Sequence, residues 1–199
     1  MPTGVAIRDV RGHLLDAAER VLLRDGASAL TSRAVTTEAG CAKGVLHRHF
    51  PDFDAFLTEL VHDRVARIDD QATILRKSAG TGTIAHNLTQ ALLDLFESAA
   101  VAVISLVTSR DGLRARLRED RPTGVPILTD AATAIASYLT AERELDRITA
   151  DADVDTLAPT LIGAAHMLFA DRQGNPPKAE DIHKVVTTVI APVERQPPR

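Results

Sequence analysis

The sequence predicts an all-α protein of about nine helices, with an N-terminal three-helix helix-turn-helix domain and a larger C-terminal helical bundle. Apolar residues recur at i, i+3 and i+4 along nearly the whole chain, as they do in amphipathic helices. Glycine, proline and capping residues interrupt this pattern at points that suit helix ends. The apolar segment 99–109 would also suit a buried strand, but the sequence contains no second strand candidate to pair with it. These observations together favour helices throughout.

The helix boundaries follow from these interruptions. Gly26, Gly40 and Pro51 are stop signals, and Thr31 and Asp52 are residues that cap the first turn of a helix. The predicted helices cover about residues 10–25, 32–39, 43–50, 53–77, 84–99, 99–109, 127–145, 155–171 and 179–191.

The stretch Asp111–Asp120 alternates charges of both signs, and we expect a solvated, self-paired helical turn there. The chain then divides into a head (residues 8–52), a body (residues 53–192) for ligand binding and dimerisation, and a disordered tail (residues 193–199).

Composition excludes several classes of protein. The 199 residues are 45% hydrophobic and 25% charged, which is ordinary for a globular protein. One cysteine, Cys41, excludes an internal disulfide, and aromatic residues at 3% are too few to stack single-stranded nucleic acid. The N-terminus has no apolar segment of a signal peptide, so we expect a cytoplasmic protein without a membrane span. The net charge of −4 combines +2 over residues 1–50 with −6 over the rest, a weak indication of a nucleic-acid-binding head on an acidic body.

The segment 31–50 has the pattern of a helix-turn-helix, with two short helices around a glycine-containing turn. Its small and apolar residues fall on faces that can pack inward: Ala34, Val35, Ala39, Cys41, Leu46 and Phe50. Its second helix leaves polar and small residues facing outward: Lys43, Gly44, His47, Arg48 and His49. A helix start with Lys and Gly suits close approach to phosphate, and His and Arg can reach base edges in the major groove.

Residues 14–60 resemble the N-terminal domain of the TetR family of bacterial transcription regulators. The matching residues are Leu15, Ala17, Ala18, Gly26, Thr31, Ala39, Gly40, Lys43, Gly44, Leu46, Arg48, His49, Phe50, Ala55, Phe56 and Leu57. This resemblance implies a homodimer that binds a palindromic operator, usually as a repressor, and a small ligand in the body that lowers operator affinity. We expect no enzymatic activity, no cofactor and no metal.

Four positions depart from the family pattern. Ala42 stands where a Ser usually caps the recognition helix, and Val45 replaces a frequent Thr or Ser. His47 stands where a Tyr usually contacts phosphate, and Phe53 stands where a Lys usually binds the DNA backbone. Each change removes a polar partner for DNA. His47 can restore a cation below its pKa, which would make DNA binding depend on pH.

Three sets of candidate site residues follow. The DNA-binding set is Thr31, Ser32, Arg33, Ala42, Lys43, Gly44, Val45, His47, Arg48 and His49. The ligand-binding set contains polar or aromatic residues on apolar helices: His62, His86, Phe96, Ser105, Thr108, Tyr138 and His166. The dimer-interface set comes from the last two helices, which are apolar on more than one face: Leu157, Leu161, Ala165, Leu168, Ile182, Val186 and Val189. The low aromatic content suggests a pocket with aliphatic walls and an apolar effector.

Other functions remain open from the sequence. Two Glu-x-x-His pairs, Glu59/His62 and Glu180/His183, occur in di-iron helical bundles and leave an enzyme as a rival. Cys41 can be a buried plug or a redox switch. The departures at Ala42, His47 and Phe53 leave room for a ligand-binding dimer whose head no longer binds DNA.

Overall fold

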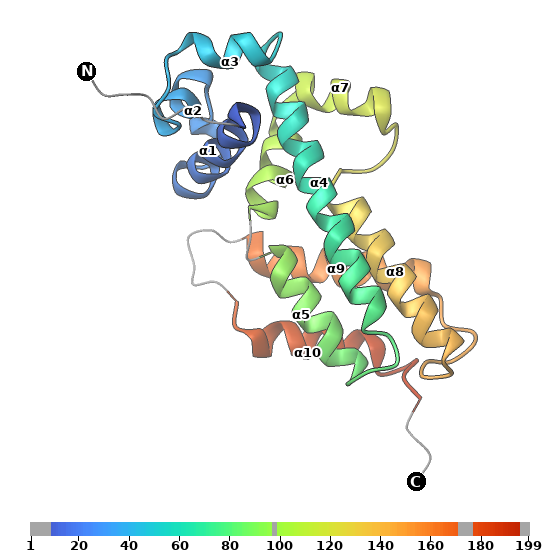
Figure 1. Ribbon diagram of the computed structural model, residues 1–199. Coiled ribbons are helices and arrows are strands. Elements are labelled where there is room, and N and C mark those ends of the chain that lie inside the picture. The colour runs from blue at the N-terminus through green and yellow to red at the C-terminus, as the bar shows by residue number, and fades with distance from the viewer. Residues whose placement is uncertain (1–8, 97–98, 171–176, 196–199) are drawn as a thin grey trace.

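The computed structural model describes residues 9–96, 99–170 and 177–195 (Figure 1). Within these ranges the chain forms ten α-helices, one 3-10 helix and no β-strand, apart from an isolated bridge between Ile148 and Glu194. The all-α prediction is confirmed. The helices are α1 (Val10–Asp25), η1 (Ala27–Ala29), α2 (Ser32–Glu38), α3 (Gly44–His49), α4 (Phe53–Lys77), α5 (Ile84–Phe96), α6 (Ala100–Ser109), α7 (Asp111–Asp120), α8 (Leu128–Glu144), α9 (Val154–Ala170) and α10 (Ala179–Ile190).

The predicted caps form in the head. Thr31 and Asp52 each accept a hydrogen bond from the backbone N–H three residues on, at 3.1 and 2.6 Å. These bonds satisfy N–H groups that the first turn of a helix leaves unpaired. Gly26 ends α1 with a φ of 83°, a conformation that favours glycine. Local chemistry therefore fixes where α1, α2 and α4 begin or end.

The segment Asp111–Asp120 is a full helix, α7, rather than the solvated turn that we expected. Leu113 and Leu117 lie four residues apart and are both buried, so the helix has a narrow apolar stripe among its charges. The charged residues outnumber these two leucines, so the apolar stripe is hard to recognise in the sequence. This helix accounts for the difference between ten helices and about nine.

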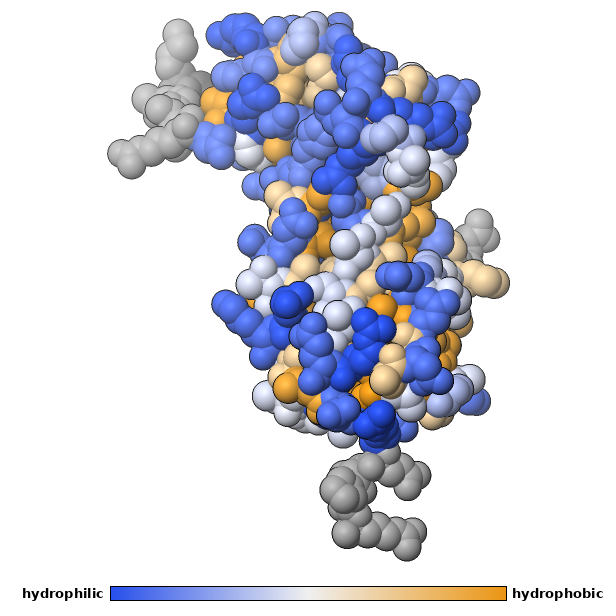
Figure 2. All heavy atoms as spheres, turned by 90° about the vertical axis from the view of Figure 1, so that its right-hand side faces the viewer, coloured by the Kyte–Doolittle hydropathy of each residue, from blue (hydrophilic) through white to orange (hydrophobic). Residues whose placement is uncertain are grey.

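The head lies at one end of the molecule, and α4 runs from it through the body (Figure 1). Helix α1 packs against α2 and η1, and α6 packs against η1 and α1. Contacts between head and body therefore extend beyond the chain junction at residue 52. Viewed from the side of α7 and α8, the end of the molecule that holds the head and α7 is mainly hydrophilic, and more hydrophobic residues show below it (Figure 2).

The body is a bundle in which α4 packs on α8, α8 on α9, and α10 on both α5 and α9. One continuous cluster of buried apolar residues joins the head and the body. The described part of the chain has no single helix that could cross a membrane by length and apolarity. Helices α5 and α6 meet that test only as a pair, across a 57° bend.

The tail begins later than we expected. The Thr149 N–H donates to the Val193 carbonyl at 2.8 Å, and the Arg195 N–H donates to the Arg147 carbonyl at 2.9 Å. Residues 193–195 are therefore paired with the loop between α8 and α9, which corrects the predicted start of disorder. The rest of the predicted tail, 196–199, lies outside the described residues.

Candidate nucleic-acid interface

The helix-turn-helix packs as its apolar pattern predicts. Val35 and Leu46 are fully buried, and Ala39 and Phe50 are nearly so. Cys41 lies partly buried between α2 and α3, and burial raises the pKa of its thiol. A thiol with a raised pKa is a poor nucleophile. This environment favours the packing role of Cys41 over the redox role.

Most of the ten predicted DNA-binding residues lie on the outer surface of the head. Ser32 and Val45 are partly buried, and the Ser32 hydroxyl is enclosed without a hydrogen-bond partner in the described structure. The exposed ones are Thr31, Arg33, Ala42, Lys43, Gly44, His47, Arg48 and His49. These residues come from α2, the turn and α3, which lie at one end of the molecule (Figure 1).

The basic residues of this surface are electrostatically uncompensated. Arg33, Lys43 and Arg48 form no ion pair with any residue that the structure describes. Glu38, the one acidic residue of segment 31–50, is instead held by two arginines of α1 at 2.8 Å each. These hydrogen bonds lower the pKa of Glu38. The surface thus presents three positive charges, and the one carboxylate of segment 31–50 is already paired with other residues.

Gly44 leaves open space at the start of α3. A Cβ atom placed there would meet no atom within 4 Å, so the packing of the chain does not require a glycine. Glycine in a helix costs up to about 1 kcal/mol relative to alanine. The missing side chain gives a flat surface that the backbone of another molecule can approach closely.

Two departures from the family pattern have visible consequences. The start of α3 has no side-chain cap, because Ala42 has no polar atom to offer and Lys43 makes no capping bond. Phe53 packs inward on Phe56, with ring centroids 5.7 Å apart, and the Arg110 guanidinium lies 5.6 Å from its ring. Phe53 is therefore a packing residue between α4 and the α6–α7 junction.

Three arginines outside the predicted set hold the head in position. Arg110 donates to the Leu30 carbonyl at 2.9 Å, and Arg116 donates to both carboxylate oxygens of Asp52 at 2.8 and 3.1 Å. The Arg116 pair lowers the pKa of Asp52 to about 2. Arg11 stacks over the Phe50 ring at 4.5 Å. The partners of Arg110 and Arg116 lie 80 and 64 residues away in sequence, so no local signal reveals these contacts.

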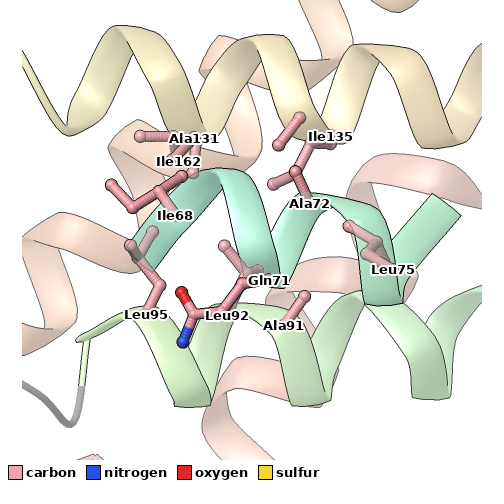
Figure 3. Close-up of a pocket in the computed structure, with 11 residues that line it drawn as sticks. Ile68, Gln71, Ala72, Leu75, Ala91, Leu92, Leu95, Ala131, Ile135 and Ile162 are labelled. Atoms are coloured by element: carbon pink, nitrogen blue, oxygen red, sulfur yellow. The ribbon is translucent and has the colours of Figure 1, made fainter. Parts of the chain in front are cut away.

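An apolar cavity of about 30 Å³ lies in the body between α4, α5, α8 and α9 (Figure 3). None of the seven predicted ligand-binding residues lines it. Its walls are aliphatic apart from the Gln71 amide, as the low aromatic content suggests. The lining residues are Ile68, Gln71, Ala72, Leu75, Ala91, Leu92, Leu95, Ala131, Ala134, Ile135 and Ile162.

Tyr138, one of the predicted ligand contacts, is wholly buried with its hydroxyl already paired. The hydroxyl donates to Glu142 at 2.5 Å and accepts from the Asn87 amide at 3.1 Å. Burial and the Glu142 bond raise the pKa of Tyr138. Arg147 in turn pairs with Glu142 at 3.1 Å. This network ties α5 to α8 and leaves the Tyr138 hydroxyl unavailable to a ligand.

The other six predicted ligand residues are scattered over the body. Phe96 and His166 are neighbours between α5 and α9, with ring centroids 5.9 Å apart, and burial lowers the pKa of His166. Ser105 and Thr108 are exposed on α6. Of the remaining two, His62 is partly buried on α4 and His86 lines a second cavity beside the first. Polarity on an apolar helix is thus a poor guide to the cavity, which is built mainly from aliphatic residues.

The predicted dimer-interface residues divide by burial. Leu161, Ala165, Ile182 and Val186 are all 0% exposed within a single chain, so they stabilise the protomer and have no surface for a second copy. Helices α9 and α10 pack on each other and on α5. This packing occupies one apolar face of α9 and one of α10. The larger apolar residues of these helices that keep exposed surface are Leu157, Met167, Leu168, Val185 and Val189.

The two Glu-x-x-His pairs have other partners. Glu59 lies 3.5 Å from Arg11, and the His183 ring lies 3.2 Å from the Thr89 hydroxyl. In the described parts of the chain, no three His, Cys, Asp or Glu side chains come together as possible metal ligands. The described residues therefore do not assemble the four-carboxylate set of a di-iron site.

Residues 14–60 match the family described as "Bacterial regulatory proteins, tetR family". No curated protein matches the chain in sequence. Solved structures similar to the whole chain include a transcriptional regulator from Rhodococcus sp. Rha1, at 17% identity and a TM-score of 0.71, covering 95% of this chain and 100% of that one.

Two further solved structures have the same arrangement of helices. Reduced NemR of E. coli matches at 16% identity and a TM-score of 0.73, covering 93% of this chain and 97% of that one. SmeT, the repressor of the Stenotrophomonas maltophilia multidrug efflux pump SmeDEF, matches at 16% identity and a TM-score of 0.65, covering 94% of this chain and 92% of that one. The resemblance seen in the sequence is confirmed: the head matches the tetR family, and the whole chain has the fold of TetR-family regulators.

Proposed function

We propose that the chain is a ligand-responsive transcription regulator, most simply a repressor, that binds a palindromic DNA operator as a homodimer. The observation that supports this most directly is the uncompensated charge of Arg33, Lys43 and Arg48 on the exposed helix-turn-helix. Cations that pair with phosphate release the counterions of DNA and supply much of the binding free energy. A surface of this kind has no evident use within the protomer itself.

In this proposal α3 enters the major groove and α2 lies across the backbone. Lys43 and the open surface at Gly44 approach phosphate at the start of α3, and His47 and Arg48 reach base edges or backbone. Two heads related by a two-fold axis would meet successive major grooves about 34–36 Å apart. The operator would then be an inverted repeat.

The dimer forms, in this proposal, through the outward face of α9 and α10. Met167 and Leu168 are 78% and 37% exposed, and Val185 and Val189 are partly exposed on the neighbouring helix. Large apolar side chains gathered on adjacent helices are typical of an interface.

Ligand response follows from the position of the cavity. Helix α4 forms one wall of it and begins immediately after α3, so one rigid element joins the cavity to the head. A cavity of about 30 Å³ holds little more than one water molecule. A larger ligand requires α4 to move relative to α5 or α8, and the head moves with α4. A ligand that prefers this second arrangement weakens operator binding by its difference in affinity for the two states.

A regulator of this kind acts on the chromosome, so we infer a cytoplasmic protein. We also infer that the protein has no enzymatic activity. The test is selection of binding sites from a random duplex DNA library with purified full-length protein, at stated salt and pH. Enrichment of an inverted repeat is the expected result. A folded, dimeric protein that enriches no sequence would instead favour a ligand-binding dimer whose head has lost DNA binding, in line with the missing cap at Ala42 and the inward packing of Phe53.

A further inference from the structure

Two cavities lie next to each other between α4 and α5. The inner one, of about 30 Å³, is also lined by residues of α8 and α9. The outer one, of about 160 Å³, lies beside the loop that follows α4. Gln71, Leu75 and Ala91 line both of them. The cavities therefore meet at these three side chains, and we refer to the pair as the α4–α5 slot.

The inner end of the slot suits an alkyl group. Ile68, Leu92, Leu95, Ile135 and Ile162 line it, and no described residue there carries a ring or a charge. Along α4 the inner lining extends from residue 68 to residue 75, which is about 10 Å of helix. This end is narrow, because its volume is small for that length. A narrow aliphatic channel accommodates an unbranched chain better than a ring.

The outer end of the slot is polar. Ser78, His86, Asn87 and Gln90 contribute hydrogen-bonding groups, and Asp94 contributes a carboxylate. Neither cavity is lined by a Lys or Arg among the described residues. A ligand carboxylate would therefore meet Asp94 with no cation to offset the repulsion. A hydroxyl or an ammonium group would find acceptors there.

Gln71 lies at the junction of the two ends. Its side chain reaches from α4 toward α5, on the side of the cavity where Leu92 and Leu95 lie (Figure 3). It is partly buried, and its amide makes no hydrogen bond to any other described residue. The amide atoms still reach water, and a ligand that displaces this water must replace its hydrogen bonds. The Gln71 amide is thus positioned to bond a polar group at the end of an alkyl chain.

We propose that the effector is a small unbranched aliphatic molecule with an uncharged or cationic hydrogen-bonding group at one end. The alkyl chain occupies the inner end of the slot, which widens beyond about 30 Å³ as α4 moves, and the polar group bonds to Gln71. This inference rests on the proposed ligand-responsive function and specifies the chemistry that elicits the response.

The test measures direct binding of 1-alkanols to the full-length protein by isothermal titration calorimetry, with no DNA present. Each added methylene buried in the slot is expected to tighten binding about fourfold, the equivalent of about 0.8 kcal/mol, until the chain outgrows the inner end. At equal chain length the 1-alkylamine binds comparably to the alkanol, and the alkanoate binds more weakly.

Two variants locate the site. Ala91→Leu fills the junction between the cavities and abolishes the dependence of affinity on chain length, whereas Ala115→Leu, the same change on the exposed side of α7, leaves it intact. Gln71→Met keeps the size of the side chain and removes the amide, and weakens alkanol binding roughly three- to tenfold. It also keeps the site testable should Ala91→Leu fail to fold, as monitored by thermal unfolding.

Three results would overturn the inference: no binding of any alkanol to folded protein, alkanoates that bind as tightly as alkanols, or variants at residues 71 and 91 that both bind as the unaltered protein does. None of these results bears on whether the head binds DNA. Conversely, a failed operator selection leaves the calorimetric result standing. The two proposals can therefore fail separately.

Discussion

Lys43→Ala removes one of the three uncompensated cations of the helix-turn-helix, and its effect on DNA binding can be worked out from the structure. Each protomer presents Arg33, Lys43 and Arg48 without an acidic partner among the described residues, so a dimer contacts up to six phosphates. Each contact contributes about −0.9 to the slope of log K against log salt concentration, which gives a slope of about −5.4 for the unaltered protein. Removing Lys43 from both protomers leaves four contacts and a slope of about −3.6.

The assay is fluorescence anisotropy with a labelled selected duplex, repeated at several salt concentrations. The matched control is Lys77→Ala, because Lys77 is an exposed lysine at the other end of α4, away from the head. The control is expected to keep the original slope. An unchanged slope for Lys43→Ala would remove Lys43 from the phosphate contacts and refute the argument that uncompensated charge marks the interface.

Three further predictions follow from other parts of the structure. Gly44→Ala raises the midpoint of thermal unfolding, since alanine is favoured over glycine in a helix by up to about 1 kcal/mol. The same change weakens operator binding severalfold, and unchanged operator binding would show that DNA does not approach this surface. Leu168→Asp yields a folded monomer in sizing experiments. Val186→Asp places a charge at a fully buried position, so this variant loses helical circular dichroism. A folded dimer in the Leu168 variant would show that the interface lies elsewhere. Because the hydrogen bonds from Arg116 and from the Ala55 N–H lower the pKa of Asp52 from 3.8 to about 2, their stabilising effect is complete above about pH 5 and lost as the pH falls toward 2. Urea unfolding should therefore show that Arg116→Ala destabilises the protein at pH 6 with a difference that shrinks toward pH 2, and a difference independent of pH would argue against this ion pair.

The sequence predicts the head well because its signals are local. Thr31 and Asp52 cap the helices they precede, and Gly26 ends the first helix at a positive φ. Each of these roles depends on atoms within a few residues. The inward positions of the helix-turn-helix follow from helical periodicity in the same way.

The body is harder to predict because its features depend on contacts between distant segments. The last two helices are apolar on more than one face, and sequence alone does not reveal that Leu161 and Ile182 belong to the core of the protomer. The cavity needs four helices to form, and nearly all of its lining is aliphatic. Tyr138 is the instructive exception, since its partner Glu142 lies one helical turn away and could have been found in the sequence.

The most direct test of the account is hydroxyl-radical footprinting of the full-length protein on a selected duplex, combined with the mass of the complex by analytical ultracentrifugation. The account predicts two protomers per duplex and two protected half-sites on one side of the DNA, separated by about 34–36 Å or a multiple of that spacing. A single protected segment with one protomer bound, or protection without any two-fold symmetry, would contradict a dimer that reads DNA through two helix-turn-helix surfaces.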